Sequence, residues 1–426
     1  MADQNLKGRR RVSLMIFLVV LSASLHVCFA EIGHSQPPKN TSTLHPTDVN
    51  TFGSSVVLPV SGNVYPLGSY SVTVEIGNPP KQFQLDIDTG SDYAWVQCYA
   101  PCVGCTLPPE RRYKPATDNY VLCKDPICSA FQSSNPPQCS RNPNEKCSFQ
   151  IEYADHGSVS GVVVSDSFPL RLVNGTVSRP RMAFGCGYKL KKHDPFSSPA
   201  IAGVLGLGRS KASISAQLSS VGVSQNIVGH CFNDKGGFLS FGADLVPKSG
   251  MTWAPMLRSS SDNHYSLGPA EVFFRGNPTG IKGLNVIFDT GSTYTYLNSG
   301  AYGSLLNLIM KDLNRKPLQQ VQDKALPICW KGSRPFVSVR DVQNYFGILA
   351  LSFAGSSNIQ LQLPPQTYLI VTEQGNVCLG ILNGTEVGLG TTNLIGDISM
   401  QGKLMLFDNE NQRIGWASAD CTHKFG

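Results

Sequence analysis

Several short segments of the chain alternate apolar and polar side chains, the pattern of half-buried β-strands. One of them, FQLDID at residues 83–88, runs directly into Asp88-Thr89-Gly90-Ser91. A second apolar segment, LNVIFD at residues 284–289, runs into Asp289-Thr290-Gly291-Ser292, 201 positions after the first. In both places a predicted strand delivers an aspartate into a glycine-containing turn, where a rigid scaffold commonly presents functional side chains.

A second motif follows each of these turns at a similar distance. It consists of two apolar residues and a glycine, and it occurs as Val204-Leu205-Gly206 and as Leu394-Ile395-Gly396. Because both motifs recur in the same order, the sequence predicts two versions of one unit. The first copy, GVLGLG, lacks the full spacing of a dinucleotide-binding turn, so we expect a packed strand there. Residues 301–315 have helical periodicity and predict one of the few helices.

Composition agrees with a β-rich protein of two domains. The chain has 426 residues, of which 41% are hydrophobic and 15% charged, and it contains 41 glycines and 28 prolines. This length and apolar content exclude a disordered chain and allow two sizeable cores. The abundance of glycine and proline indicates short strands joined by tight turns.

The N-terminus resembles a targeting segment. The segment KGRRR at residues 7–11, with four basic residues, precedes an apolar run that ends at Ala30. We therefore expect residues 1–30 to be a secretory signal peptide, with an uncleaved signal anchor as the alternative. Its removal lowers the formal net charge from +6 to +3 and discards the strongest basic run. We therefore expect neither nucleic-acid binding nor a membrane span in the mature chain.

The cysteines agree with export. Of the thirteen cysteines, Cys28 lies in the expected signal peptide, and the remaining twelve suit six disulfides in an oxidising compartment. Zinc is the competing interpretation for seven cysteines that include CxxxC and CxxC spacings, namely Cys98, Cys102, Cys105, Cys123, Cys128, Cys139 and Cys147. Three sequons begin at Asn40, Asn174 and Asn383, and they are candidate glycosylation sites on a secretory route.

Two carboxylates on matching turns of a duplicated unit predict a shared acid-base site. Like charges held close together cannot both ionise cheaply, so Asp88 and Asp289 would share one proton. The ionised member could then activate a water molecule while the protonated member polarises a peptide carbonyl. The glycines keep backbone N–H groups close to the carboxylates, and Thr89 and Thr290 can bond across to the other half. Two ordinary structural turns are the alternative.

With these motifs, the sequence resembles the pepsin-like aspartic endopeptidases, and among them the plant nucellin-like proteinases, over roughly residues 66–421. Trp95, seven positions after Asp88, extends the likeness. The resemblance implies an all-β fold of two pseudo-twofold related, barrel-like lobes with few short helices. It also implies a catalytic dyad of Asp88 and Asp289, whose outer oxygens are supported by Ser91 and Ser292.

The same resemblance assigns a flap and the organisation of the chain. Residues 151–161 look like the flap hairpin, with the Trp95 indole N–H donating to the Tyr153 hydroxyl and with His156 as a solvated loop residue. We expect a possible propeptide at 31–64, a first strand near Tyr65, an N-terminal lobe at 65–250 and a C-terminal lobe at 251–426. Prosegments of the family often cover the dyad with basic residues, but residues 31–64 contain one lysine, Lys39, and no arginine. The segment is therefore either an inhibitory propeptide or a prosegment that another protease removes.

Counting cysteines in each expected lobe gives odd numbers, nine and three, so complete pairing requires an odd number of disulfides between lobes. Related plant enzymes suggest Cys231 with Cys421, Cys329 with Cys378 inside the C-terminal lobe, and Cys186 with the Cys-rich insert.

The resemblance also implies the partners of the mature chain. They are peptide or protein substrates and pepstatin-type inhibitors, with no cofactor and no metal. We expect a monomer in the secretory pathway, destined for the extracellular space, the cell wall or the vacuole. The alternative is a pepsin-like binding or inhibitor protein with weak catalysis.

Overall fold

The computed structural model describes residues 54–132, 139, 142–191, 201–257, 263–353 and 358–422. Two compact units divide the chain, residues 1–49 and residues 50–426, and every described residue belongs to the second unit. The expected signal peptide at 1–30, most of the expected propeptide and the sequon at Asn40 lie outside the described residues.

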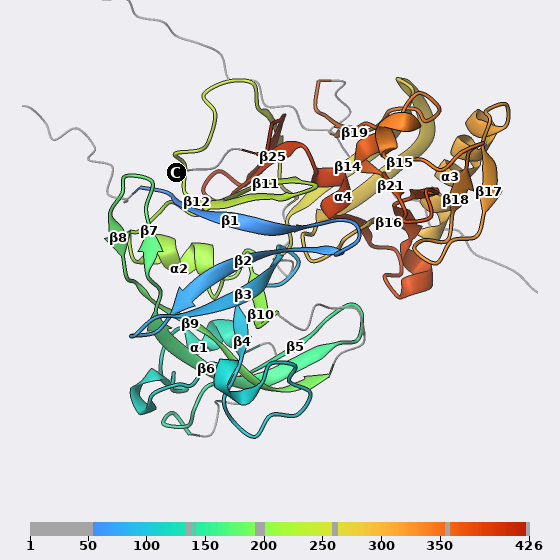
Figure 1. Ribbon diagram of the computed structural model, residues 1–426. Coiled ribbons are helices and arrows are strands. Elements are labelled where there is room, and N and C mark those ends of the chain that lie inside the picture. Colours follow the sequence, from blue (N-terminus) through green and yellow to red (C-terminus); the bar gives the residue numbers. More distant parts are fainter. Residues whose placement is uncertain are drawn as a thin grey trace, which may run out of the picture. The chain divides into compact units, whose positions relative to one another are not determined.

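The largest sheet combines strands from both ends of the described chain. Within the described ranges it has thirteen strands, in the order β13 (Thr252–Pro255), β26 (Arg413–Ser418), β25 (Lys403–Asp408), β11 (Ile227–Asn233), β12 (Gly236–Phe241), β1 (Val56–Asn63), β2 (Ser69–Ile76), β3 (Lys81–Asp88), β10 (Gly203–Gly206), β4 (Trp95–Gln97), β9 (Arg181–Lys191), β6 (Ser158–Ser167) and β5 (Ser148–Glu152). Figure 1 shows β25, from the end of the chain, beside β11. The two halves therefore share one sheet.

The start of this sheet corrects one expectation. We expected the first strand near Tyr65, but β1 already covers Val56–Asn63 and pairs with both β12 and β2. Pro59 and Gly62 interrupt the alternating pattern in this segment, and both residue types are depleted in strands. The last part of the 31–64 segment is therefore an interior strand of the sheet.

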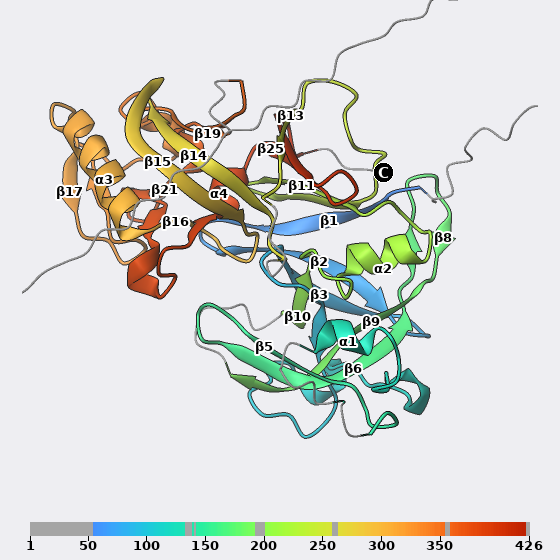
Figure 2. The same cartoon turned by 180° about the vertical axis from the view of Figure 1, so that it is seen from behind.

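The C-terminal half builds its own sheet. Within the described part of that half the sheet has seven strands, in the order β20 (Gln360–Leu363), β19 (Leu349–Phe353), β14 (Ser266–Phe274), β15 (Asn277–Phe288), β24 (Asn393–Ile395), β16 (Thr295–Leu297) and β23 (Ile381–Asn383). Figure 2 shows β14 and β15 as a long hairpin. A four-stranded sheet contains β17 (Gln319–Val321), β18 (Cys329–Lys331), β22 (Val377–Leu379) and β21 (Leu369–Val371), and a small hairpin contains β7 (Leu170–Arg171) and β8 (Val177–Ser178).

Helices are few, as expected for a mostly β fold. The α-helices of the described residues are α1 (Cys128–Phe131), α2 (Ile214–Ser220), α3 (Ser299–Leu313) and α4 (Asp397–Met400). Short 3-10 helices are η1 (Pro109–Arg111), η2 (Thr117–Asn119), η4 (Val339–Asp341), η5 (Pro365–Thr367) and η6 (Gly384–Val387). The periodicity at 301–315 correctly predicted α3, which begins after the N-cap Asn298 and buries its face of Ala301, Leu305, Ile309 and Leu313. None of these helices is long and apolar enough to cross a membrane.

The predicted internal repeat is visible in the strand pairing. In the first half β10 runs parallel to β3, with Gly206 beside Asp88, and antiparallel to β4. In the second half β24 runs parallel to β15, with Ile395 beside Phe288, and antiparallel to β16. The apolar-apolar-Gly motif therefore forms, in each half, a buried strand between the strand before the aspartate and the strand after it. This arrangement fixes both aspartate turns to the cores of their own halves.

Candidate active site

Each aspartate turn is tied to its motif strand by backbone hydrogen bonds. The Leu207 N–H donates to the Asp88 carbonyl at 2.7 Å, and the Asp289 N–H donates to the Ile395 carbonyl at 3.0 Å. Asp88 is the last residue of β3, and Asp289 directly follows β15. Both carboxylates are therefore presented from the ends of strands that are held on both sides.

The two turns meet through reciprocal threonine hydrogen bonds. The Thr89 N–H donates to the Thr290 hydroxyl at 3.0 Å, and the Thr290 N–H donates to the Thr89 hydroxyl at 3.0 Å. The Thr89 hydroxyl in turn donates to the Phe288 carbonyl at 2.9 Å, and the Thr290 hydroxyl donates to the Ile87 carbonyl at 3.1 Å. Both threonines are buried. Because every donor and acceptor in this group is paired, the two turns have one fixed arrangement.

The glycines of the turns allow the carboxylates to approach across this junction. A Cβ atom at Gly90 would lie 2.6 Å from Oδ1 of Asp289, and one at Gly291 would lie 2.6 Å from Oδ1 of Asp88. Such contacts are too short for any side chain. Each glycine therefore has a steric reason to occupy its position, because the carboxylate of the opposite half lies against its backbone.

The carboxylates have matching hydrogen bonds on their own turns. At Asp88, the Gly90 N–H donates to Oδ1 at 2.8 Å and the Ser91 hydroxyl donates to Oδ2. At Asp289, the Gly291 N–H donates to Oδ1 at 2.8 Å and the Ser292 hydroxyl donates to Oδ2 at 2.7 Å. These bonds orient both carboxyl groups in the same way in the two halves. The site is therefore symmetric in its polar contacts.

Burial and the neighbouring charge change the acidity of this pair. Burial, followed by the charge of Asp289, raises the pKa of the Asp88 carboxyl to about 7. The hydrogen bonds from Ser91 and Gly90 act in the opposite direction, because they stabilise the ionised form. Below about pH 7 the Asp88 carboxyl carries a proton, and the Asp289 carboxyl lies beside it. The pair can therefore offer a base and an acid at the same time.

A third carboxyl lies beside this pair, and our sequence analysis did not identify it. Asp397 is 1% exposed, its backbone N–H donates to the Ser292 carbonyl at 2.8 Å, and its Oδ1 has no hydrogen-bond partner among the described residues. Burial, followed by the charges of Asp289, Asp86 and Asp88, raises the pKa of Asp397 well above its usual value. Its position directly after Leu394-Ile395-Gly396 was the available signal, because that motif packs against the aspartate turn.

The expected flap residues also lie at this site. The Trp95 indole N–H donates to the Tyr153 hydroxyl at 2.7 Å, and the carboxylate of Asp88 acts on Tyr153 strongly enough to raise the pKa of its phenol, after the larger effect of burial. Tyr153 directly follows β5, which forms a hairpin with β6, and its N–H donates to the Gly157 carbonyl at 2.9 Å. His156 is exposed at the turn. The hairpin therefore carries a tyrosine to the aspartate pair.

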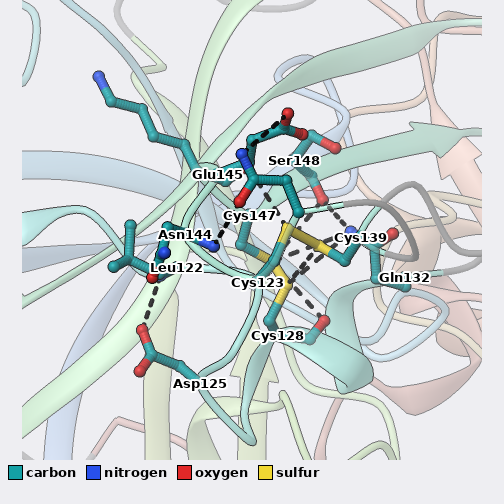
Figure 3. Close-up of a disulfide and its surroundings, with 12 residues drawn as sticks. Leu122, Cys123, Asp125, Cys128, Gln132, Cys139, Asn144, Glu145, Cys147 and Ser148 are labelled. Carbon is teal, nitrogen blue, oxygen red and sulfur yellow. Dashed lines mark hydrogen bonds between the residues drawn. A yellow bond between two sulfur atoms is a disulfide. The ribbon is translucent and has the colours of Figure 1, made fainter.

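The cysteines of the insert are joined in disulfides. Cys123 bonds to Cys139 and Cys128 bonds to Cys147, and these cysteines lie close together in Figure 3. The sulfurs of Cys123, Cys128 and Cys139 lie within 4.8 Å of one another, which is close enough for a metal site. Because each of them is consumed by a disulfide, the zinc interpretation does not fit these residues.

The other disulfides follow the expected connectivity. The structure joins Cys231 to Cys421 and Cys329 to Cys378, and it joins Cys186 to Cys98. The remaining bond of the described chain, Cys102 to Cys105, closes a short turn of the insert. One covalent link, Cys231 to Cys421, therefore connects the two halves, as their odd cysteine counts require.

The two described sequons differ in their surroundings. Asn174 is exposed between β7 and β8, and its Oδ1 accepts hydrogen bonds from the backbone N–H and the hydroxyl of Thr176 at 3.0 and 2.8 Å. Asn383 is only partly exposed, its Nδ2 donates to Glu386 at 2.8 Å, and its Oδ1 accepts from the Ser299 hydroxyl at 3.0 Å. The side-chain nitrogen that would carry a glycan is therefore already bonded at Asn383.

Comparisons with known proteins identify the relatives of this chain. The xylanase inhibitor N-terminal family matches residues 70–243, and the xylanase inhibitor C-terminal family matches residues 269–418. An aspartic proteinase of Oryza sativa subsp. japonica is 40% identical over 381 residues, which cover 86% of this chain and 92% of the relative.

Solved structures agree in fold at low sequence identity. The basic 7S globulin from soybean superposes with a TM-score of 0.66 and 18% identity, covering 87% of this chain and 98% of the globulin. The aspartic proteinase from Irpex lacteus superposes with a TM-score of 0.61 and 17% identity, covering 87% of this chain and 99% of the proteinase. The fold is the mostly β, two-lobed fold of the pepsin-like proteinases. With both family matches spanning most of the chain, the protein belongs to the plant pepsin-like aspartic proteinase family.

Proposed function

We propose that this protein is a secreted aspartic endopeptidase that hydrolyses peptide bonds with Asp88 and Asp289 as its catalytic dyad. The symmetric pairing of the two carboxyls, each held by the same glycine N–H and serine hydroxyl, is the main support. The rice relative, named as an aspartic proteinase, supports the same class of activity. Within the family, the sequence motifs favour a nucellin-like member.

The geometry provides a water molecule with both a base and an acid. The ionised carboxyl takes a proton from the water as its oxygen attacks the peptide carbonyl carbon. The protonated carboxyl donates to the carbonyl oxygen, which gains negative charge as the tetrahedral intermediate forms. The carboxyl that took the water proton then gives it to the leaving amine as the C–N bond breaks. A hydroxyl of the tetrahedral intermediate returns its proton to the other carboxyl as the new carbonyl forms, so the pair again holds one proton. Thr89 and Thr290 keep the two carboxyls in register during these steps, because both turns are bonded to one another.

The pKa of the carboxyl pair sets the pH range of this mechanism. The pair must keep one proton, and the pKa of Asp88 is raised to about 7 by burial and by Asp289. As the pH rises through that value, the pair loses its last proton and with it the acid. We therefore expect activity on the acid side of neutrality and a decline towards alkaline pH.

Two substitutions test the dyad with little change in shape. Asp88→Asn and Asp289→Asn should each lower kcat by at least about 1000-fold, because the shared proton and the base are lost together. Activity on a diverse peptide pool is measured from pH 3 to pH 8 with and without pepstatin. Asp408→Asn is the matched control, since Asp408 is a buried carboxyl paired with Arg413 outside this site. Near wild-type activity in a folded Asp88→Asn protein would refute the mechanism.

A pepsin-like inhibitor or binding protein is the second candidate. The names of both matching families, which refer to xylanase inhibitors, favour it. The complete set of dyad contacts favours the enzyme, because a binding protein has no need for paired, acid-shifted carboxyls. The peptide-pool experiment separates the two: a binding protein shows no acid-dependent cleavage at any pH, whereas the enzyme shows cleavage that pepstatin blocks.

The remaining features concern the export, the partners and the processing of the chain. Six disulfides in the described residues agree with passage through an oxidising secretory route to the cell exterior, cell wall or vacuole. Peptide or protein chains are the proposed substrates, and we propose that the protein acts as a monomer. A propeptide, if it is removed, ends before Val56, because β1 is an interior strand of the largest sheet.

A further inference from the structure

The joint between the two halves, where β11 of the N-terminal half pairs with β25 from the end of the chain, contains a buried histidine. His230 is in β11, where it pairs with Leu239 of β12 on one side and with Met405 of β25 on the other. Its side chain is 0% exposed, and neither ring nitrogen has a hydrogen-bond partner among the described residues. A buried polar group without a partner destabilises the fold, so its presence here calls for an explanation.

The imidazole is the central ring of an aromatic column that crosses this joint. Its ring centroid lies 4.2 Å from that of Phe232 and 5.7 Å from that of Phe407. Phe232 stacks on Tyr70 of β2 at 4.2 Å, and Phe407 packs on Tyr265, just before β14, at 4.4 Å. The column therefore connects strands of the N-terminal half with strands of the C-terminal half. A charge on its central ring would have to be accommodated among apolar neighbours.

Among the described residues of the neighbouring strands, no carboxylate faces the imidazole to stabilise such a charge. β12 and β1 contain no ionisable side chain. On β25, Lys403 shares a face with Met405, and its ammonium donates to the carbonyls of Ser399 and Gln401 at 3.2 and 3.4 Å. Asp408 lies on the opposite face, paired with Arg413.

The ionisable groups at the two ends of the column also leave the histidine without a partner. They are the phenols of Tyr70 and Tyr265, whose pKa values are raised by burial, and Asp397 and Asp234, whose charges act on Tyr70. Burial lowers the pKa of His230 to about 3, and no charged group contributes to this shift.

We propose that His230 is an acid-sensitive element of the joint: it is neutral in the folded protein, and its protonation in acid loosens the packing between β11 and β25. The unfolded chain binds this proton near pH 6.5, whereas the folded chain resists it down to about pH 3. Stability from this group is therefore complete above pH 6.5 and is lost as the pH falls below that value. The joint becomes weaker under acid conditions, independently of whether the aspartate pair is catalytic.

The adjacent disulfide limits how far the halves can separate. Cys231 follows His230 on β11, so its side chain lies on the opposite face of the strand, where it bonds to Cys421. When the aromatic column loosens, this bond still ties β11 to the end of the chain. We therefore expect the opening in acid to be reversible while the disulfide is intact.

The test compares His230→Phe with the unmodified residue, both in a protein carrying Asp289→Asn so that self-cleavage does not interfere. Denaturant unfolding is measured at pH 6.5 and pH 4. His230 alone should raise the unfolding equilibrium constant by about 150-fold between these pH values, and His230→Phe should remove that increment. His156→Gln is the control, because it removes an exposed histidine that is not part of the aromatic column.

A direct measurement covers the case in which His230→Phe does not fold. Nitrogen chemical shifts of the imidazoles, followed by NMR in the protein with His230 intact, should show that the His230 imidazole remains neutral at pH 4. Titration of His230 near 6.5 would overturn the proposal. So would a pH dependence of unfolding that is the same with histidine and with phenylalanine at this position.

Discussion

Thr89 and Thr290 each donate a backbone N–H to the hydroxyl of the other at 3.0 Å, across a sequence separation of 201 residues. This pair is the contact through which the two aspartate turns fix one another. The same hydroxyls donate onward to carbonyls of Phe288 and Ile87, so each threonine satisfies a buried donor and a buried acceptor of the opposite half. The separation of the two carboxyls is therefore determined by hydrogen bonds and not by loop flexibility.

Removing one of these hydroxyls should weaken both stability and activity. Thr89→Val retains the shape of the side chain but leaves the Thr290 N–H and the Phe288 carbonyl unpaired, at about 1–3 kcal/mol for each buried group. Urea unfolding and kcat measure the two effects. Thr89→Ser, which keeps the hydroxyl, is the control and should remain close to wild type. Equal stabilities of the valine and serine variants would contradict this role.

The hydrogen bond between Trp95 and Tyr153 should contribute to catalysis as a unit. Trp95→Phe and Tyr153→Phe each remove the same bond, and each should lower kcat/KM by roughly 10-fold, which corresponds to about 1.4 kcal/mol. The double variant should be no worse than the poorer single variant, because only one bond is lost. A double variant whose losses simply add would show that the two rings act separately.

Asp397→Asn should stabilise the protein at neutral pH. Folding raises the pKa of Asp397, so the stability that its proton provides is present below about pH 4 and is lost as the pH rises. The amide carries no charge and avoids this loss, so we expect the gain in unfolding free energy to be present at pH 7 and almost absent at pH 3. Thermal unfolding at both pH values measures the difference. Asp408→Asn should have the opposite effect at pH 7, because it breaks the contact with Arg413. A loss of stability in Asp397→Asn at pH 7 would indicate that the carboxylate is stabilised there.

Loss of the link between the halves should destabilise the fold strongly. Cys231→Ala combined with Cys421→Ala opens a loop of 190 residues and should lower the unfolding free energy by about 2–5 kcal/mol. Guanidinium unfolding of the double variant gives this value. The matched comparison is Cys102→Ala with Cys105→Ala, which opens a loop of only 3 residues and should cost much less. Similar losses from both pairs would exclude constraint of the unfolded chain as the main effect.

Glycosylation should favour Asn174 over Asn383. The Asn174 amide nitrogen lies on an exposed hairpin, whereas the Asn383 nitrogen would have to give up its bond to Glu386. Intact mass before and after enzymatic deglycosylation should show occupancy at Asn174, and Asn174→Gln should remove that mass. Recovery of unmodified Asn174 together with modified Asn383 would reverse this expectation.

The sequence by itself determined the features that depend on local pattern and on duplication. Alternation predicted the strand that ends at Asp88, helical periodicity predicted α3, and the recurrence of Asp-Thr-Gly-Ser predicted two related halves. These features follow from side-chain period and turn chemistry, both of which are local. β1 was missed for the same reason, because Pro59 and Gly62 obscure its pattern and its pairing with β12 and β2 stabilises it from outside.

Only the tertiary structure decided which distant groups share an environment. The only local signal for Asp397 is its position after Leu394-Ile395-Gly396, and local sequence does not show that the side chains of His230 and Asp397 are buried without full hydrogen bonding among the described residues. Their state depends on strands and turns contributed from elsewhere in the chain, such as β25 against β11 and the Ser292 carbonyl against the Asp397 N–H. Burial depends on the packing of the whole chain. The pKa of a carboxyl or an imidazole depends on that burial and on the charges around the group, so the ionisation of these two residues is determined by the tertiary structure.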